Sequence, residues 1–344
     1  MRTKAAILFE TNKPLIIDEV EIPKLKRGQA LVKIFASGIC RAQYNEIIAL
    51  KGPDRYLPHL LGHEASGEVV EVGEEVKKVK SGDFVVCTWI KGKGLDGIAT
   101  EYSYQGRIIN AGGITTFSEF AVISENRLVK ISKKVPPDVA AVLGCAIPTG
   151  VGIILRTLKV QKGSSIAIFG VGGVGSSVIL GAKMAGCSSI IAVDIAESKL
   201  AFARILGANH TIHVLKENIA ERIKKITGKG VDYAVEASGN KQAMESAFEV
   251  LVDKGKLAIA GNLKKGEKIC IIPFDLIKGK KIMGTWGGET KTDIDIPYYA
   301  RKYLSGDLKV DKLITQRLRF EEINKAFDDM KENKIKGRAV IEFI

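Results

Sequence analysis

Residues 165–175 read Ser-Ile-Ala-Ile-Phe-Gly-Val-Gly-Gly-Val-Gly, which combines a strand-like apolar run with a glycine-rich turn. A short apolar run leads directly into the pattern G-x-G-x-x-G, with its glycines at Gly170, Gly172 and Gly175. The run predicts a buried strand, and residues 174–184 predict a helix. The first glycine permits a tight turn, the second lets a pyrophosphate approach the backbone, and the third lets the helix pack on the strand. The stretch therefore predicts a dinucleotide-binding unit.

The expected cofactor of this unit is NAD(H). Free N–H groups at a helix N-terminus favour anions, so we expect the pyrophosphate beside Gly170, Gly172, Gly173, Val174 and Gly175. Asp194 ends the next apolar run, where a carboxylate can accept hydrogen bonds from the ribose hydroxyls and repel a 2′-phosphate. This favours NAD over NADP. Lys199 is a candidate contact of the adenosine ribose, and a solvated helix face is its alternative interpretation.

Strand and helix patterns alternate from residue 165 to residue 260, which predicts a parallel, doubly wound sheet. The first half of the chain is β-rich instead, with apolar or alternating runs at 3–10, 15–20, 30–35, 65–73 and 83–87. We expect 3–10 and 15–20 to form a hairpin. The predicted class is α/β, with a β-rich domain at 1–146 and 286–344 and a nucleotide-binding domain at 147–285. Apolar runs predict edge strands at 256–260, 268–272 and 281–285.

Length and composition limit the alternatives. A chain of 344 residues corresponds to about two domains, and 46% apolar residues exclude wholesale disorder. No apolar run approaches the ~18 residues of a membrane span, so we expect no membrane partner. The net charge is +13, but its lysines are scattered in pairs rather than gathered in a basic block, so we expect no nucleic-acid partner. Five cysteines without a CxxC pair argue against a disulfide framework and favour the cytoplasm.

Three residues that follow or adjoin glycines are candidate metal ligands: Cys40, His63 and Cys145. Two thiolates and one imidazole suit tetrahedral Zn²⁺ and leave one coordination position open for a substrate. Their spacing alone does not select them, because each cysteine taken singly also suits a buried structural position.

The whole chain resembles the medium-chain zinc-dependent alcohol dehydrogenases, a family of the medium-chain dehydrogenase/reductase superfamily. The motifs that carry the resemblance are Gly-Ile-Cys-Arg at 38–41, Gly-His-Glu-Ala-Ser-Gly at 62–67 and Gly-Cys-Ala-Ile-Pro-Thr-Gly at 144–150. The resemblance implies a GroES-like catalytic domain beside a Rossmann domain. It also implies that zinc is held by Cys40, His63 and Cys145, with Glu64 beside the metal.

The resemblance implies further contacts to the cofactor. Thr149 matches a residue beside the nicotinamide, and Arg41 and Arg338 match basic residues that contact the pyrophosphate. The implied reaction is reversible hydride transfer between a small alcohol or carbonyl substrate and NAD(H), with zinc as the Lewis acid. Relatives pair the edge strands of their nucleotide domains, so we expect a homodimer, with a homotetramer as the alternative.

The sequence departs from the family pattern near the first ligand. Ala42 stands where the family usually has a Ser or Thr hydroxyl that passes the alcohol proton to solvent, and Gln43 stands where it usually has Asp. Gln43, Tyr44, His59 or an ordered water are candidate replacements for the proton relay. A second reading is therefore a polyol, sugar or cyclitol dehydrogenase, whose substrate supplies its own relay. A third is a nucleotide-binding protein without turnover.

A second departure concerns the structural zinc of the family, which needs four closely spaced cysteines. No cysteine lies between Thr88 and Ala111, so we expect one catalytic zinc per chain and no structural zinc. This glycine-rich segment is then free to shape the substrate entrance or a subunit contact. Trp89 is a candidate wall of the substrate pocket, with a core position as the alternative.

Overall fold

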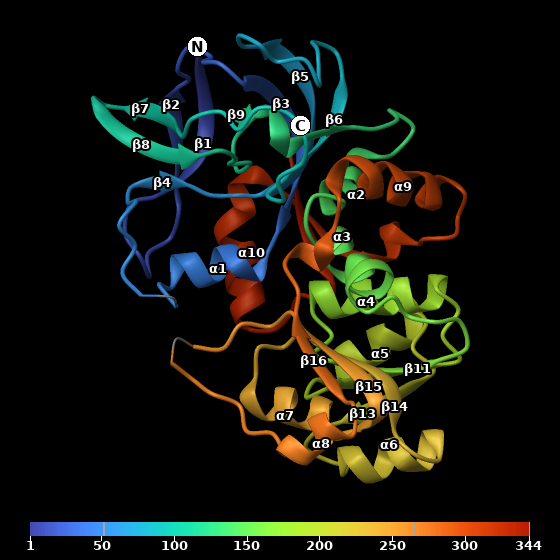
Figure 1. Ribbon diagram of the computed structural model, residues 1–344. Coiled ribbons are helices and arrows are strands. Elements are labelled where there is room, and N and C mark those ends of the chain that lie inside the picture. Colours follow the sequence, from blue (N-terminus) through green and yellow to red (C-terminus); the bar gives the residue numbers. More distant parts are fainter. Residues whose placement is uncertain (51, 265, 344) are drawn as a thin grey trace. The chain divides into compact units, whose positions relative to one another are not determined.

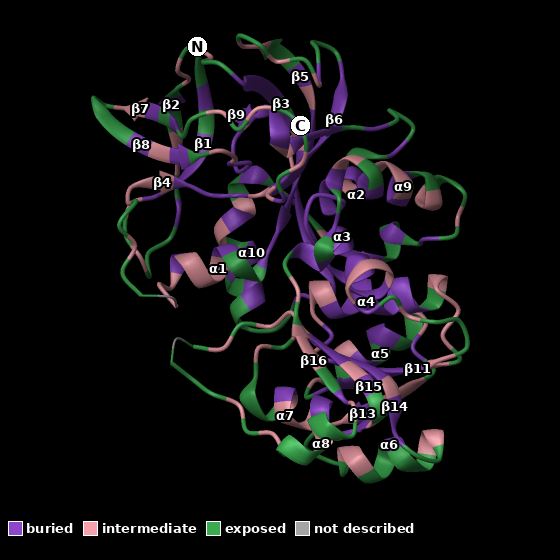
Figure 2. Ribbon diagram, viewed as in Figure 1, coloured by how far each residue is buried: buried purple, intermediate pink, exposed green. Residues whose placement is uncertain are grey.

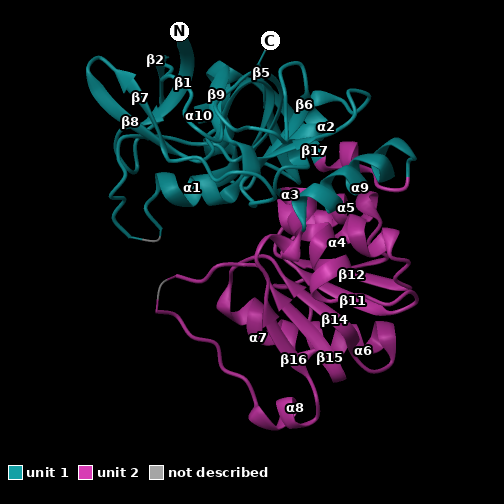
Figure 3. Cartoon of the chain, turned by 45° about the horizontal axis from the view of Figure 1, so that its top comes forward, with its two compact units in different colours: residues 1–145, 291–306, 314–344 teal, residues 146–290, 307–313 magenta. Residues whose placement is uncertain are grey.

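A computed structural model describes residues 1–50, 52–264 and 266–343. The chain divides into two compact units (Figure 3). Unit 1 contains residues 1–145, 291–306 and 314–344, and unit 2 contains residues 146–290 and 307–313. The observed boundaries lie within a few residues of 146 and 286, and the short segment 307–313 belongs to unit 2 rather than to the last part of unit 1.

Unit 2 is built on a six-stranded sheet with the order β13-β12-β11-β14-β15-β16, and every neighbouring pair is parallel. The strands are β11 (Ser165–Phe169), β12 (Ser189–Asp194), β13 (His210–His213), β14 (Val231–Glu236), β15 (Leu251–Ile259) and β16 (Lys281–Gly284). All residues of β11 are buried, as expected for a strand that helices cover on both faces. This confirms the doubly wound parallel sheet that the sequence predicts.

Helices cover both faces of this sheet (Figure 1). Apolar residues of α6 and α7, among them Ile223 and Phe248, join one buried cluster with the strands, and α4 and α5 pack on the opposite face. The helices are α3 (Ala146–Gly152), the π-helical η2 (Ile153–Thr157), α4 (Gly173–Met184), α5 (Glu197–Leu206), α6 (Ile219–Thr227), α7 (Lys241–Glu249), α8 (Pro273–Ile277), η3 (Gly287–Glu289) and η4 (Val310–Leu313). Figure 2 shows burial concentrated on the strands, whereas α8 has no buried residue.

Unit 1 contains two sheets. Five strands close on themselves in the order β1-β2-β7-β8-β4, and a seven-stranded sheet has the order β10-β6-β5-β3-β18-β17, with β9 paired to β3. The strands are β1 (Arg2–Leu8), β2 (Ile16–Glu21), β3 (Gln29–Ile39), β4 (His59–Leu60), β5 (Glu64–Val72), β6 (Phe84–Thr88), β7 (Thr100–Tyr104), β8 (Arg107–Gly112), β9 (Phe120–Ser124), β10 (Leu128–Lys130), β17 (Ile314–Arg319) and β18 (Arg338–Glu342).

The helices of unit 1 pack at the ends and sides of these sheets. They are α1 (Arg41–Ile47), η1 (Glu125–Arg127), α2 (Pro137–Val142), α9 (Thr292–Leu304), η5 (Phe320–Glu322) and α10 (Ile323–Lys331). Residues of α10 such as Phe327 share an apolar cluster with Leu8 of β1 and Ile39 of β3. Within the described residues, no helix combines the length and apolar character that a membrane crossing requires.

The structure confirms the predicted hairpin and corrects one strand. β1 and β2 pair antiparallel, from Arg2 opposite Glu21 to Ile7 opposite Ile16. The strand expected at 268–272 does not form. The N–H of Cys270 donates to the carboxylate of Glu245 on α7 at 2.8 Å, so this N–H serves a side chain rather than a strand ladder. Apolar character alone did not distinguish this exposed segment from an edge strand.

Candidate metal centre and cofactor turn

Cys40 reaches the candidate metal centre because β3 ends directly before it. Ile39 is the last residue of β3, and Cys40 is the N-cap of α1. Gly38 crosses beside Glu64 so closely that a Cβ at this position would lie 2.6 Å from the Glu64 carboxyl carbon. The glycine in this motif is therefore required to admit the Glu64 side chain.

His63 and Glu64 enter the site at the start of β5. Gly62 has a φ of +96°, and a Cβ there would lie 2.4 Å from Thr116 Oγ1, so only glycine fits this turn. The backbone carbonyl of Glu64 accepts a hydrogen bond from the buried Ser37 hydroxyl at 3.0 Å. The turn and this hydrogen bond fix the two adjacent side chains where β5 begins.

Cys145 follows α2 and is placed by another glycine. A Cβ on Gly144 would lie 2.4 Å from the carbonyl oxygen of Cys87 and 2.9 Å from the Cα of Glu64. The backbone before Cys145 therefore packs directly against β5 and β6. Such a close approach explains why a glycine precedes this cysteine.

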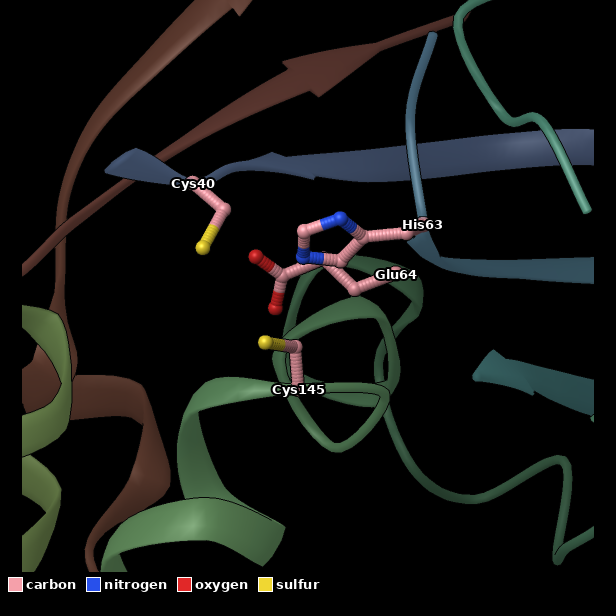
Figure 4. A group of neighbouring side chains, drawn as sticks. All are labelled: Cys40, His63, Glu64 and Cys145. Carbon is pink, nitrogen blue, oxygen red and sulfur yellow. The ribbon is translucent and has the colours of Figure 1, made fainter. Parts of the chain in front are cut away.

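These segments bring four side chains to one point. One atom each from Cys40, His63, Glu64 and Cys145 lies within 4.8 Å of the other three. Figure 4 shows both sulfur atoms, an imidazole nitrogen and the carboxylate facing the same space. Three of these residues are buried, with Glu64 at 0% exposure. The four expected ligand residues are thus brought together.

A buried arginine compensates the negative charge of the cluster. Arg338, the first residue of β18, is 4% exposed, and its Nη2 lies 2.7 Å from Glu64 Oε1. Burial alone lowers the pKa of this guanidinium, but the nearby Cys40, Glu64 and Cys145 charges raise it overall. Arg338 therefore keeps its charge and helps hold anionic groups in a buried place.

The thiols and the imidazole are electrostatically linked. A hydrogen bond from the Cys145 thiol, with the Arg338 charge and His63, holds the pKa of Cys40 well below its usual value against the effect of burial. The same hydrogen bond, together with burial, raises the pKa of Cys145. Burial lowers the pKa of His63, yet the Cys40 charge raises it overall. The thiol–thiol hydrogen bond and the arginine charge therefore favour negative charge on Cys40.

The donor set fits a zinc ion. His63 Nε2 is buried and has no hydrogen-bond partner among the described residues. A buried nitrogen without a partner is costly unless another group satisfies it, and a metal ion does so. Two thiolates, one imidazole and a carboxylate are the ligands that Zn²⁺ prefers.

The glycine turn of unit 2 fits a dinucleotide. Gly170 has a φ of +88°, and a Cβ on Gly175 would lie 1.9 Å from the Gly170 carbonyl oxygen. A Cβ on Gly172, the N-cap of α4, would meet nothing within 4 Å, so space is open where a phosphate approaches. Asp194 Oδ2 accepts from the N–H of Val171 at 2.7 Å, which ties the expected ribose acid to the turn.

Comparisons with known proteins agree with this chemistry. A family model described as an alcohol dehydrogenase GroES-like domain matches residues 26–133, and one described as a zinc-binding dehydrogenase matches residues 173–300. S-(hydroxymethyl)glutathione dehydrogenase of Synechocystis sp. is 34% identical over an alignment that covers 100% of both chains.

The chain belongs to the zinc-dependent alcohol dehydrogenase family. It is therefore an oxidoreductase of a family that uses zinc and NAD(H). Benzyl alcohol dehydrogenase from Acinetobacter calcoaceticus is similar in structure, with a TM-score of 0.91, 29% identity and 100% of both chains covered. 2R,3R-butanediol dehydrogenase from Bacillus subtilis has a TM-score of 0.82 and 26% identity, with 99% of this chain and 100% of the other covered. The expected GroES-like and Rossmann architecture is confirmed.

Other expected residues of this alcohol dehydrogenase lie as follows. Arg41 is exposed on α1, where its guanidinium lies 5.2 Å from the centroid of the Tyr44 ring and donates to the Met330 carbonyl at 3.2 Å. Thr149 is buried on α3 and Lys199 is partly exposed on α5. The Trp89 ring lies 6.4 Å from the His63 ring, centroid to centroid, which places this tryptophan beside the metal centre.

The candidate relay groups differ in their surroundings. Ala42 is exposed, and Gln43 is buried with Oε1 lacking a hydrogen-bond partner among the described residues. His59 is engaged elsewhere, since its Nε2 lies 2.8 Å from Asp54 Oδ2 and its Nδ1 lies 2.9 Å from the Leu60 carbonyl. His59, the first residue of β4, therefore has a local structural role, because it ties this strand to Asp54 in the loop before it.

Two buried hydroxyls beside the cluster are not predicted by the sequence. Ser37 binds the Glu64 carbonyl, and Thr88 binds the Gly144 carbonyl. The sequence feature that could have indicated them is a small polar residue near the end of an apolar strand. Many strands carry such a residue without any role at a site. The contact becomes visible only when the strands are assembled.

Proposed function

We propose that the alcohol dehydrogenase family chemistry is carried by one zinc ion per chain, held by Cys40, His63 and Cys145 with Glu64 beside them. The convergence of these four donors within 4.8 Å carries the proposal. When bound, zinc supplies a Lewis acid that polarises the oxygen of an alcohol or carbonyl. The substrate class is a small alcohol or its carbonyl product, oxidised or reduced by hydride exchange with NAD(H).

The chain's own residues prepare this site. Arg338 offsets the charge of the thiolates and of Glu64, which allows anionic ligands to remain buried. Trp89 provides an apolar wall beside His63, which excludes water and orients the carbon skeleton of the substrate. Thr149 is assigned to the nicotinamide side of the reaction, as the family motif implies.

The proposed cofactor is NAD(H) rather than NADP(H). The turn from Gly170 to Gly175 with the start of α4 binds the pyrophosphate, and Asp194 binds the adenosine ribose. Lys199 is a further ribose contact in this proposal. Arg41 and Arg338 supply positive charge for the pyrophosphate.

The absence of a relay hydroxyl favours a second candidate substrate class. Ala42, the second residue of α1, carries only a methyl group, which can neither donate nor accept a proton. A polyol, sugar or cyclitol carries a neighbouring hydroxyl that can move the proton in its place. The similarity to a butanediol dehydrogenase is compatible with this class.

We propose that no structural zinc is needed, because carboxylates hold the segment after β6. Glu125 Oε2 accepts from the N–H of Leu95 at 2.7 Å, and Asp293 Oδ2 accepts from the N–H of Lys93 at 2.7 Å. The segment 88–111 is not one free loop, since its second half forms β7 and most of β8. Its first half remains the candidate for shaping the substrate entrance.

We further propose a homodimer in a reducing compartment such as the cytoplasm. β16 is an edge strand of the six-stranded sheet, and the neighbouring Phe274, Ile277 and Trp286 are exposed apolar residues. Zinc binding needs both ligand cysteines as thiolates, which a reducing compartment preserves. Sedimentation measurements distinguish one chain from a dimer or a tetramer.

The direct test is cofactor-linked turnover. Purified protein is expected to form NADH with at least one member of a panel of aliphatic alcohols, aromatic alcohols and polyols, and the best substrate chooses between the two classes. Cys40→Ser is expected to lose activity by a factor of at least about 100, because a zinc ligand is removed.

Cys87→Ala is the matched control, since Cys87 is buried in the same unit but outside the cluster. Its turnover should stay close to that of the unmodified protein. Equal activity of Cys40→Ser and Cys87→Ala, or no turnover of any substrate by zinc-loaded protein, would contradict the proposed function.

A further inference from the structure

Thr88, the last residue of β6, carries a buried hydroxyl beside the metal centre. Its exposure is 0%, and its Oγ1 donates to the carbonyl oxygen of Gly144 at 2.6 Å. Thr88 Oγ1 also accepts from the N–H of Ile90 at 3.2 Å. The hydroxyl therefore donates to one backbone group and accepts from another. A group bound in this way restrains the two peptide units that it joins.

The position of Thr88 connects two ligand-bearing segments. Thr88 lies directly opposite Glu64 in the antiparallel pairing of β5 and β6. Directly opposed residues project from the same face of a sheet, so the Thr88 side chain lies on the Glu64 side. Gly144, whose carbonyl it binds, immediately precedes Cys145. The Thr88 side chain thus ties β6, which is paired with the strand of Glu64, to the peptide that precedes Cys145.

The Gly144 backbone is confined on its other side as well. A Cβ there would collide with the Cys87 carbonyl oxygen and with the Cα of Glu64, so the peptide lies against both strands. Packing limits how near the peptide can come, and the Thr88 hydroxyl prevents it from turning away. Together they define the direction from which Cys145 enters the cluster.

We propose that Thr88 is a positioning residue that sets the Cys145 thiolate for metal binding. This inference rests on the proposed zinc site. Metal–ligand distances tolerate deviations of about 0.2 Å, so freedom in a ligand's backbone costs affinity even when the ligand itself is retained. Loss of an outer hydrogen-bond partner typically weakens metal binding by about 10- to 100-fold.

The test compares Thr88→Val with Thr88→Ser in the zinc-loaded protein. Valine keeps the branched shape and β propensity but removes the hydroxyl, whereas serine keeps the hydroxyl. Zinc release to an excess of a chelating dye is followed by absorbance. In the cobalt-substituted protein, the thiolate-to-metal absorption bands report on the two ligand sulfurs of Cys40 and Cys145.

Ser66→Ala is the matched control. Ser66 lies on β5, is 0% exposed, and donates to the Pro137 carbonyl at 2.6 Å, so it makes a hydrogen bond of the same kind and length in the same sheet. Its acceptor is the first residue of α2, so this bond involves neither a ligand residue nor the peptide next to one. The control separates a general loss of stability from an effect on the metal site.

We expect Thr88→Val to release zinc about tenfold faster and to shift the cobalt–thiolate bands. Thr88→Ser and Ser66→Ala should release zinc within twofold of the unmodified protein. If Thr88→Val does not fold, Thr88→Ala removes the same hydroxyl without placing a β-branched side chain there. The same measurements are then made on Thr88→Ala.

The results separate this inference from the proposed function. Unmodified protein that takes up no zinc contradicts the zinc site itself. Unmodified protein that binds zinc, together with a hydroxyl-free variant that releases it at the same rate with unchanged cobalt bands, contradicts the role of Thr88. Equal acceleration by Ser66→Ala also contradicts it, since a local role cannot explain that result.

Discussion

Asp194 shows how one side chain serves two needs in the cofactor turn. Its Oδ2 accepts from the N–H of Val171 at 2.7 Å, and its Oδ1 accepts from the N–H of Ala196 at 3.0 Å. The carboxylate thus holds the glycine turn on one side and the start of α5 on the other. Both oxygens act as acceptors, which an amide side chain cannot reproduce.

Asp194→Asn tests the proposed cofactor preference. The change removes the charge that repels a 2′-phosphate and turns one accepting oxygen into a donor, so NAD use should weaken while the penalty on NADP falls. We expect the NAD:NADP ratio of kcat/KM to drop about tenfold, equivalent to about 1.4 kcal/mol. Steady-state kinetics with both cofactors measure this ratio.

Glu197→Gln is the control for this change, since Glu197 is an exposed acid on α5 that pairs with Lys216 rather than with the turn. It should leave the cofactor ratio unchanged. An Asp194→Asn ratio equal to that of Glu197→Gln would show that Asp194 does not select the cofactor.

The sequence indicates some site residues through local chemistry and others only through resemblance. Gly170, Gly175 and Asp194 follow from a motif whose physical basis is local, and the turn has the expected close contacts. Cys40 and Cys145 lie far apart in the chain, and no periodic pattern joins them. Their proximity depends on the pairing of distant strands, which the residues themselves do not display.

At the scale of elements, Glu125 at the start of η1 organises two loops. Its Oε1 accepts from the N–H groups of Lys77 and Lys78, both at 2.6 Å, and its Oε2 accepts from that of Leu95. Burial raises the pKa of this carboxyl, but the three N–H donors lower it overall. The charged form therefore stabilises the fold and holds the segment that follows β6.

Glu125→Gln is expected to destabilise the protein. The amide places a donor against one of the three N–H groups, which costs about 1–3 kcal/mol of unfolding free energy at pH 7.5. Because the folded pKa is lowered, the stabilisation is present above the ordinary value of 4.5 and is lost as the pH falls through the folded pKa. Urea unfolding at pH 7.5 and at about pH 4 should show the difference shrinking on acidification.

The comparison protein for this experiment is Glu10→Gln, which changes an exposed carboxyl after β1. It should unfold at the same urea concentration as the unmodified chain. If Glu125→Gln does so too at pH 7.5, the carboxylate does not hold these loops.

Elements with a strong local pattern are predictable, and those fixed by tertiary contacts are not. The buried run 165–169 forms β11 as predicted, because parallel strands covered on both faces require continuous apolar sequence. The run 268–272 has similar composition but remains irregular, since Cys270 is tied to Glu245 instead of to a neighbouring strand. β7 and most of β8 lie within 88–111, where no strand is predicted. The sequence of β7 alternates between β-forming and polar residues, but this pattern is only five residues long and follows a glycine-rich stretch.

At the scale of the whole molecule, each unit has its own sheets and its own buried cluster. The candidate metal centre draws all four of its residues from unit 1, and the cofactor turn draws its glycines and Asp194 from unit 2. The four clustered donors and the glycine turn therefore come from different parts of the chain, while Arg338 is proposed to serve both.

The proposed function depends on a single zinc ion at the cluster of Cys40, His63 and Cys145. Elemental analysis of the purified, metal-supplemented protein tests it most directly, with Cys40→Ser and Cys87→Ala analysed in parallel. We expect about one zinc per chain for the unmodified protein and for Cys87→Ala, and much less for Cys40→Ser. Two zinc ions per chain, no zinc after supplementation, or full zinc content in Cys40→Ser would contradict it.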